Sequence, residues 1–452
     1  MDNKRSSFTG KIGFVLAAAG SAVGLGNIWR FPYLAAKYGG GMFLLTYIIL
    51  AVTFGFTLMV AEIAIGRKTG LSAIGAFGKL SEKHSFIGYL ASVIPMIILP
   101  YYSVIGGWVM KYLAAFISGN SAAAAENNYF GDFASSLGEP IFWFVLFIAA
   151  TMLVVLFGVE KGVEKVSKVM MPVLVVLSVF IAIYSVFIPG AKAGVIYYLN
   201  PDFSNFSLMT VIAAMGQLFY SMSLAMGIMI TYGSYMKKDV SIEKSTHQIE
   251  LFDTGIAFLA GLMIIPAVFA FSNGDPNALN KGPSLMFETL PKVFDFMPGG
   301  AVIGAVFFLL VLFAALTSSI SLAETVVSIF RDKLGWSRKF SCLIVLAGCI
   351  VVGLPSSLGF GVWSHIKPLG MDFLTFFDFL SNNVLMPIAA ILTCLFITFV
   401  IRPQAVVDEI EADGTKFKSK KLFNIMIKYV APVFLLAILI SSILDAFGIY
   451  KI

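Results

Sequence analysis

The sequence contains few charged residues for its length. Only 12% of its 452 residues are Asp, Glu, Lys or Arg, whereas 59% are hydrophobic and the mean hydropathy is +0.91. A soluble protein is roughly one quarter charged, so this composition excludes a soluble globular domain. It indicates instead a polytopic membrane protein, in which lipid replaces water over most of the surface.

Cysteine and histidine are also scarce. The three cysteines, Cys342, Cys349 and Cys394, all lie in apolar runs, which is typical of inert packing residues. We therefore expect neither a disulfide nor a metal cluster. The three histidines lie near loops or at the ends of apolar runs, without a nucleophile, base or second metal ligand at a suitable spacing, so the sequence argues against an enzyme.

Long apolar runs, in contrast, are abundant. A helix needs about 20 apolar residues to cross the hydrocarbon core of a bilayer. The chain contains eleven such segments, at residues 12–36, 41–66, 86–117, 140–158, 169–189, 207–233, 248–272, 299–330, 340–354, 371–400 and 427–449. The sequence thus predicts an all-α polytopic membrane protein with about eleven transmembrane helices in a single domain over residues 1–452.

Lysine and arginine are distributed unevenly between the connecting segments. If the N-terminus lies inside, the inside segments hold 23 of the 31 basic residues. The segment 119–139, which would lie outside, contains no Lys or Arg. Because cytoplasmic loops are enriched in Lys and Arg, we expect a cytoplasmic N-terminus and, after an odd number of spans, an extracytoplasmic C-terminus.

Two of the predicted spans contain residues that weaken a helix. The first includes "GSAVGLGNIWRFPY" (residues 20–33), and the sixth includes "YSMSLAMG" (residues 220–227). The backbone groups that a broken helix leaves free are tolerated in a membrane only around a polar cavity. The two segments lie five spans apart and enter the membrane from opposite sides, which predicts a 5+5 inverted repeat with discontinuous helices 1 and 6. Its halves would cover residues 12–189 and 207–400, followed by an additional helix at 427–449.

The glycines of the first segment also fit a close-packing helix face of the GxxxG type. Asn27 and Arg30 favour a functional site, because a polar amide and a cation are expensive in lipid.

These segments and several others resemble a known family. The run "GSAVGLGNIWRFPYLAAKYGGGMFLLTY", followed by Glu62 and Gly66, is similar to the signature of the neurotransmitter:sodium symporter family. Matches follow in order through "PYYSVIGGW", "GQLFYSMSLAMG", "TYGSYMKKD", "FAALTSSISL" and "DFLSNNVLMP". The resemblance covers nearly the whole chain and is closest to bacterial leucine transporter homologues, although with eleven spans rather than twelve. It implies sodium-coupled uptake by alternating access in a bacterial cytoplasmic (inner) membrane.

The resemblance also implies two sodium sites made of hard oxygen ligands. The first would use the Ala22 carbonyl and the side chains of Asn27, Ser221 and Asp253. The second would use the carbonyls of Gly20, Val23 and Ala314 and the hydroxyls of Thr317 and Ser318. The last two hydroxyls also fit hydrogen bonds back to their own helix, although their combination with the broken first span favours an ion site.

Asp253 departs from the pattern of many family members. They have asparagine there and a serine one turn later that helps to bind chloride, whereas this chain has Asp253 and Ala257. A fixed carboxylate would replace the anion, so we expect transport that is independent of chloride. The rival interpretation places Asp253 at a water-exposed helix end.

The resemblance further implies an amino-acid substrate. Monoamine carriers of the family have an aspartate at the position of Gly24, since their substrates lack a carboxylate. The free N–H groups of a broken helix attract anions, so the substrate carboxylate would lie near Gly24 and Gly26 and accept a hydrogen bond from Tyr102. The implied pocket contains no charged side chain, which predicts a neutral, mostly hydrophobic amino acid. Its residues are Ala22, Val23, Gly24, Gly26, Ile98, Tyr102, Tyr220, Ser221, Ser223, Met226 and Leu322.

Gates complete the implied mechanism. Outside the site, Arg30 would pair with Asp378, with Tyr220 as a lid and Asp372 as a rival partner. Inside, Arg5 would pair with Asp332, near Ser234 and Tyr235. The expected partners are an amino acid, sodium ions and membrane lipid, without chloride or nucleic acid. Two alternatives remain open: an amino-acid sensor without net transport, and proton-coupled uptake with Asp253 or Glu62 as the titrating group.

Overall fold

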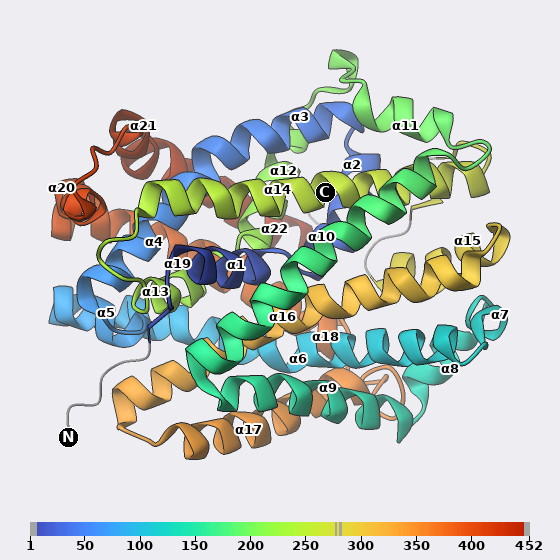
Figure 1. Cartoon of the computed structure of the whole chain (residues 1–452), viewed down its shortest axis with the longest axis horizontal. Helices are drawn as coiled ribbons and strands as arrows, with labels where there is room; N and C mark the ends of the chain where they lie inside the picture. Colours follow the sequence, from blue (N-terminus) through green and yellow to red (C-terminus); the bar gives the residue numbers. More distant parts are fainter. Residues whose placement is uncertain (1–6, 276–277, 280–282, 447–452) are drawn as a thin grey trace.

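The computed structural model describes residues 7–275, 278–279 and 283–446. These residues form helices and turns, with one isolated β-bridge between Gly40 and Pro201. The long helices run side by side through one bundle (Figure 1).

The first predicted span is interrupted in its middle. Helix α1 (Lys11–Ala22) ends at Val23, whose φ of −75° and ψ of 102° are extended rather than helical. The chain resumes as a wide π-helical turn at Gly26–Arg30 and continues into α2 (Phe31–Lys37). The two parts are bent by 53° relative to one another. The predicted break in the first helix is therefore confirmed.

The sixth span is interrupted as well. Helices α12 (Leu208–Ser221) and α13 (Ile228–Gly233) are joined by an irregular link. Three of its residues have positive φ, namely Ser223 at 54°, Ala225 at 59° and Gly227 at 74°. Such values are uncommon for residues other than glycine, so the surrounding structure must hold this link in place. Helix α1 packs against α13, and α12 packs against Gly26–Arg30, so the two breaks face each other.

Nine further helices are long and apolar enough to span a membrane in the part of the chain that the structure describes. They are Gly41–Thr69 (α3, Gly41–Leu50, and α4, Phe56–Thr69), Glu82–Ile117 (with α6, Ser85–Ile117), Glu139–Leu156 (α9), Val159–Val186 (with α10, Lys165–Val186), Ile242–Phe271 (α14), Gly300–Leu334 (α16), Arg338–Leu358 (α17), Phe373–Asp413 (α18, Phe373–Asp378; α19, Met386–Leu395; α20, Arg402–Ile410) and Lys420–Leu444 (α21, Lys420–Ile425, and α22, Ala431–Ala446). The bent pair around the first break makes a tenth span. Counting α12 and α13 together as one interrupted span gives the eleven that the sequence predicts. The shorter helices are α5 (Ala73–Leu80), α7 (Ser121–Ala124), α8 (Tyr129–Ser135), α11 (Lys192–Leu199) and α15 (Leu290–Phe296).

The helix boundaries differ most from prediction where a helix continues into charged sequence. The fifth span begins at residue 159 rather than 169, and the seventh begins at 242 rather than 248. A charged residue near the membrane surface does not end a helix when it finds a partner. Glu164, for example, accepts a hydrogen bond from the Thr9 backbone N at 2.8 Å and lies 2.6 Å from Lys168 Nζ.

The connecting segments gather at two opposite ends of the bundle (Figure 1). Helices α5, α13, α20 and α21 lie at one end, at the left of the view. Helices α7, α8, α11 and α15 lie at the other end. The lysine-rich segments assigned to one side from the sequence thus share one end of the molecule. Helix α1 packs against α10, α14 and α16, which places the two breaks near the centre.

Candidate functional site

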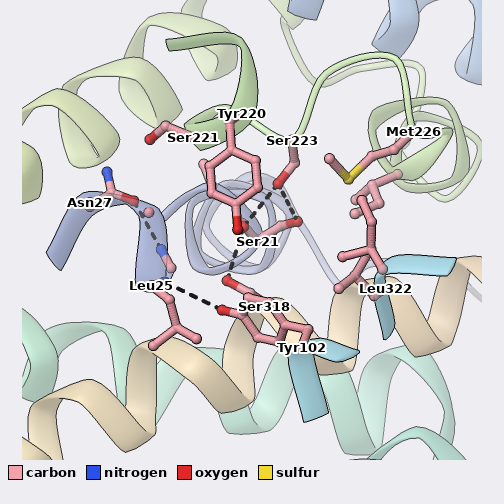
Figure 2. Close-up of a pocket in the computed structure, with 15 residues that line it drawn as sticks. Ser21, Leu25, Asn27, Tyr102, Tyr220, Ser221, Ser223, Met226, Ser318 and Leu322 are labelled. Carbon is pink, nitrogen blue, oxygen red and sulfur yellow. Dashed lines mark hydrogen bonds between the residues drawn. The ribbon is translucent and has the colours of Figure 1, made fainter. Parts of the chain in front are cut away.

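The break in the first helix leaves backbone groups that other residues must satisfy. The Gly24 N–H donates to Asn27 Oδ1 at 3.0 Å instead of to a carbonyl one turn earlier. The Leu25 N–H points to the Tyr102 hydroxyl at 3.4 Å (Figure 2). A Cβ atom at Gly24 would lie 2.7 Å from Ser318 Oγ and 3.1 Å from the Tyr102 hydroxyl. A larger residue here would therefore force the Ser318 or Tyr102 side chain to move, which favours glycine.

Three of the four residues predicted for the first sodium site lie in one buried cluster. Asp253 Oδ1 accepts hydrogen bonds from Asn27 Nδ2 at 2.8 Å and from Ser221 Oγ at 2.6 Å. Asp253 Oδ2 accepts one from the Tyr47 hydroxyl at 3.1 Å. Asp253 has no exposed surface, so it does not lie at a water-exposed helix end. The fourth residue, Ala22, lines the cavity beside this cluster.

At the second predicted sodium site, three backbone carbonyl oxygens lie close to one hydroxyl. Ser318 Oγ lies 3.3 Å from the Gly20 carbonyl oxygen, 3.1 Å from that of Ser21 and 3.2 Å from that of Val23. A serine hydroxyl carries one proton and can donate it to only one of these acceptors at a time. The surplus of acceptors suits a hard cation such as Na⁺, which prefers oxygen ligands.

Thr317 behaves differently from its neighbour Ser318. Its hydroxyl lies 3.0 Å from the Phe313 carbonyl oxygen and 3.1 Å from that of Ala314, both on its own helix α16. Thr317 also packs closely on Gly20, where a Cβ atom would meet its Cβ at 3.1 Å. The Thr317 hydroxyl thus bonds back to its own helix, as the alternative to an ion site predicts. The Ser318 hydroxyl instead contacts carbonyl oxygens of the first helix.

We expect Ser318→Ala to weaken the dependence on sodium. Losing one ligand costs on the order of 1.4 kcal/mol, so the sodium concentration for half-maximal uptake should rise about tenfold. The matched control is Thr325→Ala in the same helix, because the Thr325 hydroxyl bonds back to the Ser321 carbonyl of α16. Sodium titrations of uptake in proteoliposomes would measure both. An unchanged half-saturation in Ser318→Ala would remove Ser318 from the ion site.

A narrow cavity of about 40 Å³ lies between the two clusters (Figure 2). Ten of the eleven residues that we assign to the substrate line it, and Val23 is the exception. Tyr102 and Leu322 lie on one side of the cavity, while Tyr220, Ser221, Ser223 and Met226 come from α12 and the link that follows it. The structure therefore brings residues from four separate segments to one place.

Five further residues line the cavity although we did not assign them to the substrate: Ser21, Leu25, Asn27, Ile228 and Ser318. Ser21 Oγ lies 3.2 Å from Ser223 Oγ, and Ser223 Oγ also donates to the Ser21 carbonyl at 3.0 Å. These bonds tie the break in helix 1 to the break in helix 6. Ser21 and Leu25 belong to the run "GSAVGLGN". Their position next to the predicted break could therefore have identified them as residues that line the cavity.

Glu62 supports the irregular link of helix 6. This buried residue of α4 accepts a hydrogen bond from the Ala225 N–H at 2.7 Å. Ala225 has a positive φ, so the bond holds the backbone in a conformation that alanine rarely adopts. Gln217 supports the backbone at the first break in a similar way, since its Nε2 donates to the Gly26 carbonyl at 2.9 Å.

The outer gate residues lie near one another without forming an ion pair. The Arg30 guanidinium lies over the Tyr220 ring, 5.2 Å from its centroid. Asp378 Oδ1 accepts hydrogen bonds from Asn382 Nδ2 at 2.7 Å and from the Tyr101 hydroxyl at 3.2 Å. The rival partner Asp372 is engaged at the start of α18, where it accepts from the Thr375 N–H at 2.9 Å.

At the opposite end, Arg5 lies outside the described residues. Its predicted partner Asp332 accepts a hydrogen bond from the Ser72 N–H at 2.7 Å. Tyr235 donates to Glu324 Oε1 at 2.9 Å, while Ser234 donates to the Thr231 carbonyl at 2.5 Å. The buried Phe8 donates its N–H to the Tyr235 carbonyl at 3.1 Å and packs edge-on against the Tyr232 ring. Phe8 thus packs against the end of α13.

Two broken helices that face each other around a buried cavity are typical of secondary transporters. The family model described as the sodium:neurotransmitter symporter family matches residues 5–132 and 130–449. The chain belongs to this family. It is therefore a sodium-dependent membrane transporter and not an enzyme.

Known relatives agree with this assignment. An uncharacterized sodium-dependent transporter of Bacillus subtilis is 35% identical over 455 residues, covering 98% of each chain. One of Haemophilus influenzae is 33% identical over 460 residues, covering 98% of this chain and 99% of the relative. The crystal structure of MhsT in complex with L-phenylalanine superposes with a TM-score of 0.87 at 36% identity, covering 97% of this chain and 100% of MhsT.

Proposed function

We propose that this protein imports a neutral, mostly hydrophobic amino acid together with sodium, without a requirement for chloride. The supporting observation is the cavity beside the break in helix 1. Its lining contains no charged side chain, while the Leu25 N–H and the Tyr102 hydroxyl lie at one edge of it. Backbone N–H groups beside a helix start suit a carboxylate, and the apolar walls suit an uncharged side chain. That MhsT binds L-phenylalanine in a closely similar fold supports the same substrate class here.

Met226 is the element of the cavity that is best able to adapt its shape. The cavity has room for only about three waters, since one water needs roughly 10–15 Å³. Methionine is unbranched and flexible, so a change of its rotamer enlarges the space toward Leu322 and Ile98. Aromatic amino acids are accordingly within the proposed substrate range.

The coupling ions would occupy the two oxygen clusters. Asn27, Ser221, Asp253 and the Ala22 carbonyl would hold one, and Ser318, Thr317 and the carbonyls of Gly20, Val23 and Ala314 the other. Moving one charge across 100 mV supplies about 2.3 kcal/mol, so two ions carried with a zwitterion would supply about 4.6 kcal/mol. Because sodium helps to form the substrate site, the two should bind cooperatively in both directions.

Alternating access requires each side of the site to close in turn. We assign the basic end of the bundle to the cytoplasm, following the distribution of Lys and Arg. There, Arg5 and Asp332 would form the inner latch with Ser234 and Tyr235. At the outer end, Arg30 and Asp378 would close over Tyr220, which lies under the guanidinium.

The function is tested by uptake into proteoliposomes. Labelled neutral, acidic and basic amino acids are supplied with sodium, potassium or choline outside. We expect sodium-driven accumulation of hydrophobic neutral amino acids only. Binding without accumulation would instead identify a sensor, and accumulation driven by acid outside in the absence of sodium would identify proton coupling.

A further inference from the structure

A threonine just before the start of α1 is bonded through its backbone and its side chain. Thr9 lies two residues before α1 begins at Lys11. Its N–H donates to Glu164 Oε2 at 2.8 Å, and its hydroxyl donates to Glu164 Oε1. Its carbonyl accepts a hydrogen bond from Lys237 Nζ at 2.8 Å. Thr9 thus joins the start of α1 to the start of the fifth span and to the segment after α13.

Glu164 lies directly against α1. It is the last residue of the π-helical turn Val159–Glu164 that precedes α10, and only 1% of it is exposed. A Cβ atom at Gly13 of α1 would lie 2.8 Å from Glu164 Cγ and closer still to its carboxylate. The absence of a side chain at Gly13 therefore leaves the space that the Glu164 carboxylate occupies.

The buried carboxylate depends on Thr9 for much of its stabilisation. A buried charge is costly unless it is paired and hydrogen-bonded. Lys168 provides one partner, because its Nζ lies 2.6 Å from Glu164 Oε1. Thr9 provides two further donors, and hydrogen bonds to an ionised group are about twice as strong as those between neutral groups. Moving Thr9 away from Glu164 would remove both of these bonds together.

The residue next to Thr9 packs between the two half-helices that lead from this end of the bundle to the breaks. Phe8 is buried, and its ring packs edge-on against Phe14 of α1 and Tyr232 of α13, at centroid distances of 5.7 Å and 5.6 Å. An opening between α1 and α13 would pull Phe8 away from Tyr232 and Thr9 away from Glu164. The contacts of Thr9 therefore oppose such an opening.

We propose that Glu164 anchors the start of α1 and thereby favours the state in which this end of the transporter is closed. This role rests on the alternating access of the proposed function, in which this end faces the cytoplasm. Glu164 is a positioning residue, because it acts through α1, whose Gly20 and Val23 carbonyls lie at the proposed second sodium site. The anchor differs from the proposed pair of Arg5 and Asp332, since Asp332 belongs to α16.

The test measures how fast a cysteine between the cavity and this end reacts with a water-soluble thiol reagent. Ser321→Cys is a suitable reporter, because Ser321 of α16 is buried and accepts a hydrogen bond from the Tyr232 hydroxyl at 2.7 Å. Glu164→Gln keeps the size of the side chain but removes its charge. In the purified full chain, we expect this variant to raise the reaction rate of the reporter about tenfold, because weaker bonds to Thr9 increase the open population.

The matched control is Glu160→Gln, since Glu160 is an exposed carboxylate of the same π-helical turn. It should leave the reaction rate unchanged. The same chains without Ser321→Cys carry the three buried native cysteines, whose reaction reports a general loosening of the fold. An unchanged reporter in Glu164→Gln, or an equal increase for the native cysteines, would overturn the proposal.

A second set of variants tests the anchor without changing any charge. Gly13→Ala places a Cβ atom against Glu164 and should also speed the reaction of the reporter. Gly10→Ala is its control, because a Cβ atom there would meet no atom within 4 Å. Thr9→Val should give a rate between those of the wild type and Glu164→Gln, whereas Thr9→Ser should match the wild type.

If Glu164→Gln does not fold, Gly13→Ala decides the question. A rate no higher than that of Gly10→Ala would then refute the anchor. The reaction of the reporter requires no uptake, so the anchor can fail while the proposed transport function stands. Conversely, a chain that binds an amino acid without accumulating it would still show whether Glu164 holds this end closed.

Discussion

Gly24→Asp is expected to abolish amino-acid uptake. A Cβ atom at this position would meet Ser318 Oγ at 2.7 Å and the Tyr102 hydroxyl at 3.1 Å, so both neighbours would have to move. Overpacking of this kind costs about 1–3 kcal/mol. The new carboxylate would also compete with the substrate carboxylate for the Leu25 N–H and for sodium. We expect a loss of at least roughly 100-fold in substrate affinity, measured by binding of a labelled hydrophobic amino acid.

Two further variants separate the reasons for this loss. Gly24→Ala adds the Cβ atom without the charge and should retain part of the binding. Gly216→Ala is the matched control, because a Cβ atom at this glycine of α12 would meet no atom within 4 Å. It should leave binding unchanged and confirm that a helical glycine near the break tolerates alanine. Wild-type affinity in Gly24→Asp would refute the proposed carboxylate position.

The sequence predicts the breaks in the helices because glycine and polar residues there act locally. Gly20, Gly24 and Asn27 cannot be explained by a simple span, and the structure interrupts the helix among them. Alternation of apolar and basic segments likewise predicts the number of spans and the grouping of the basic segments at one end. These features depend on the residues of one segment and on the solvent around it.

The residues that the sequence did not reveal act through partners far away in the chain. Tyr47 donates to Asp253, and Gln217 donates to the Gly26 carbonyl, yet nothing in their own segments predicts these contacts. The different roles of the adjacent hydroxyls of Thr317 and Ser318 also depend on how α16 faces α1. The fold contains a similar feature that the sequence did not reveal. Arg402 has a φ of 63°, which changes the direction of the chain at the end of an apolar run.

Asp253→Asn combined with Ala257→Ser is expected to make uptake dependent on chloride. The Asp253 carboxylate is buried among three donors: Asn27 Nδ2 at 2.8 Å, Ser221 Oγ at 2.6 Å and the Tyr47 hydroxyl at 3.1 Å. Removing the negative charge leaves these donors, and the sodium ion that we propose beside them, uncompensated in a buried site, which costs on the order of 3–5 kcal/mol. A chloride ion can restore the charge, and serine at position 257, one turn along α14, supplies it with a further donor. In the double variant, replacing chloride with gluconate should therefore lower uptake by about tenfold or more.

The wild type should change little under the same replacement, because the carboxylate already provides the charge. Asp253→Asn alone should lose most uptake in either medium, since Ala257 offers no hydroxyl to the anion. Glu250→Gln is the matched control: it removes another buried carboxylate of α14, one turn away and paired with His247 at 3.3 Å. Its uptake should remain independent of chloride. A large drop of wild-type uptake in gluconate would contradict the assignment of Asp253 as the substitute for chloride, because a fixed charge at that position leaves no role for a soluble anion.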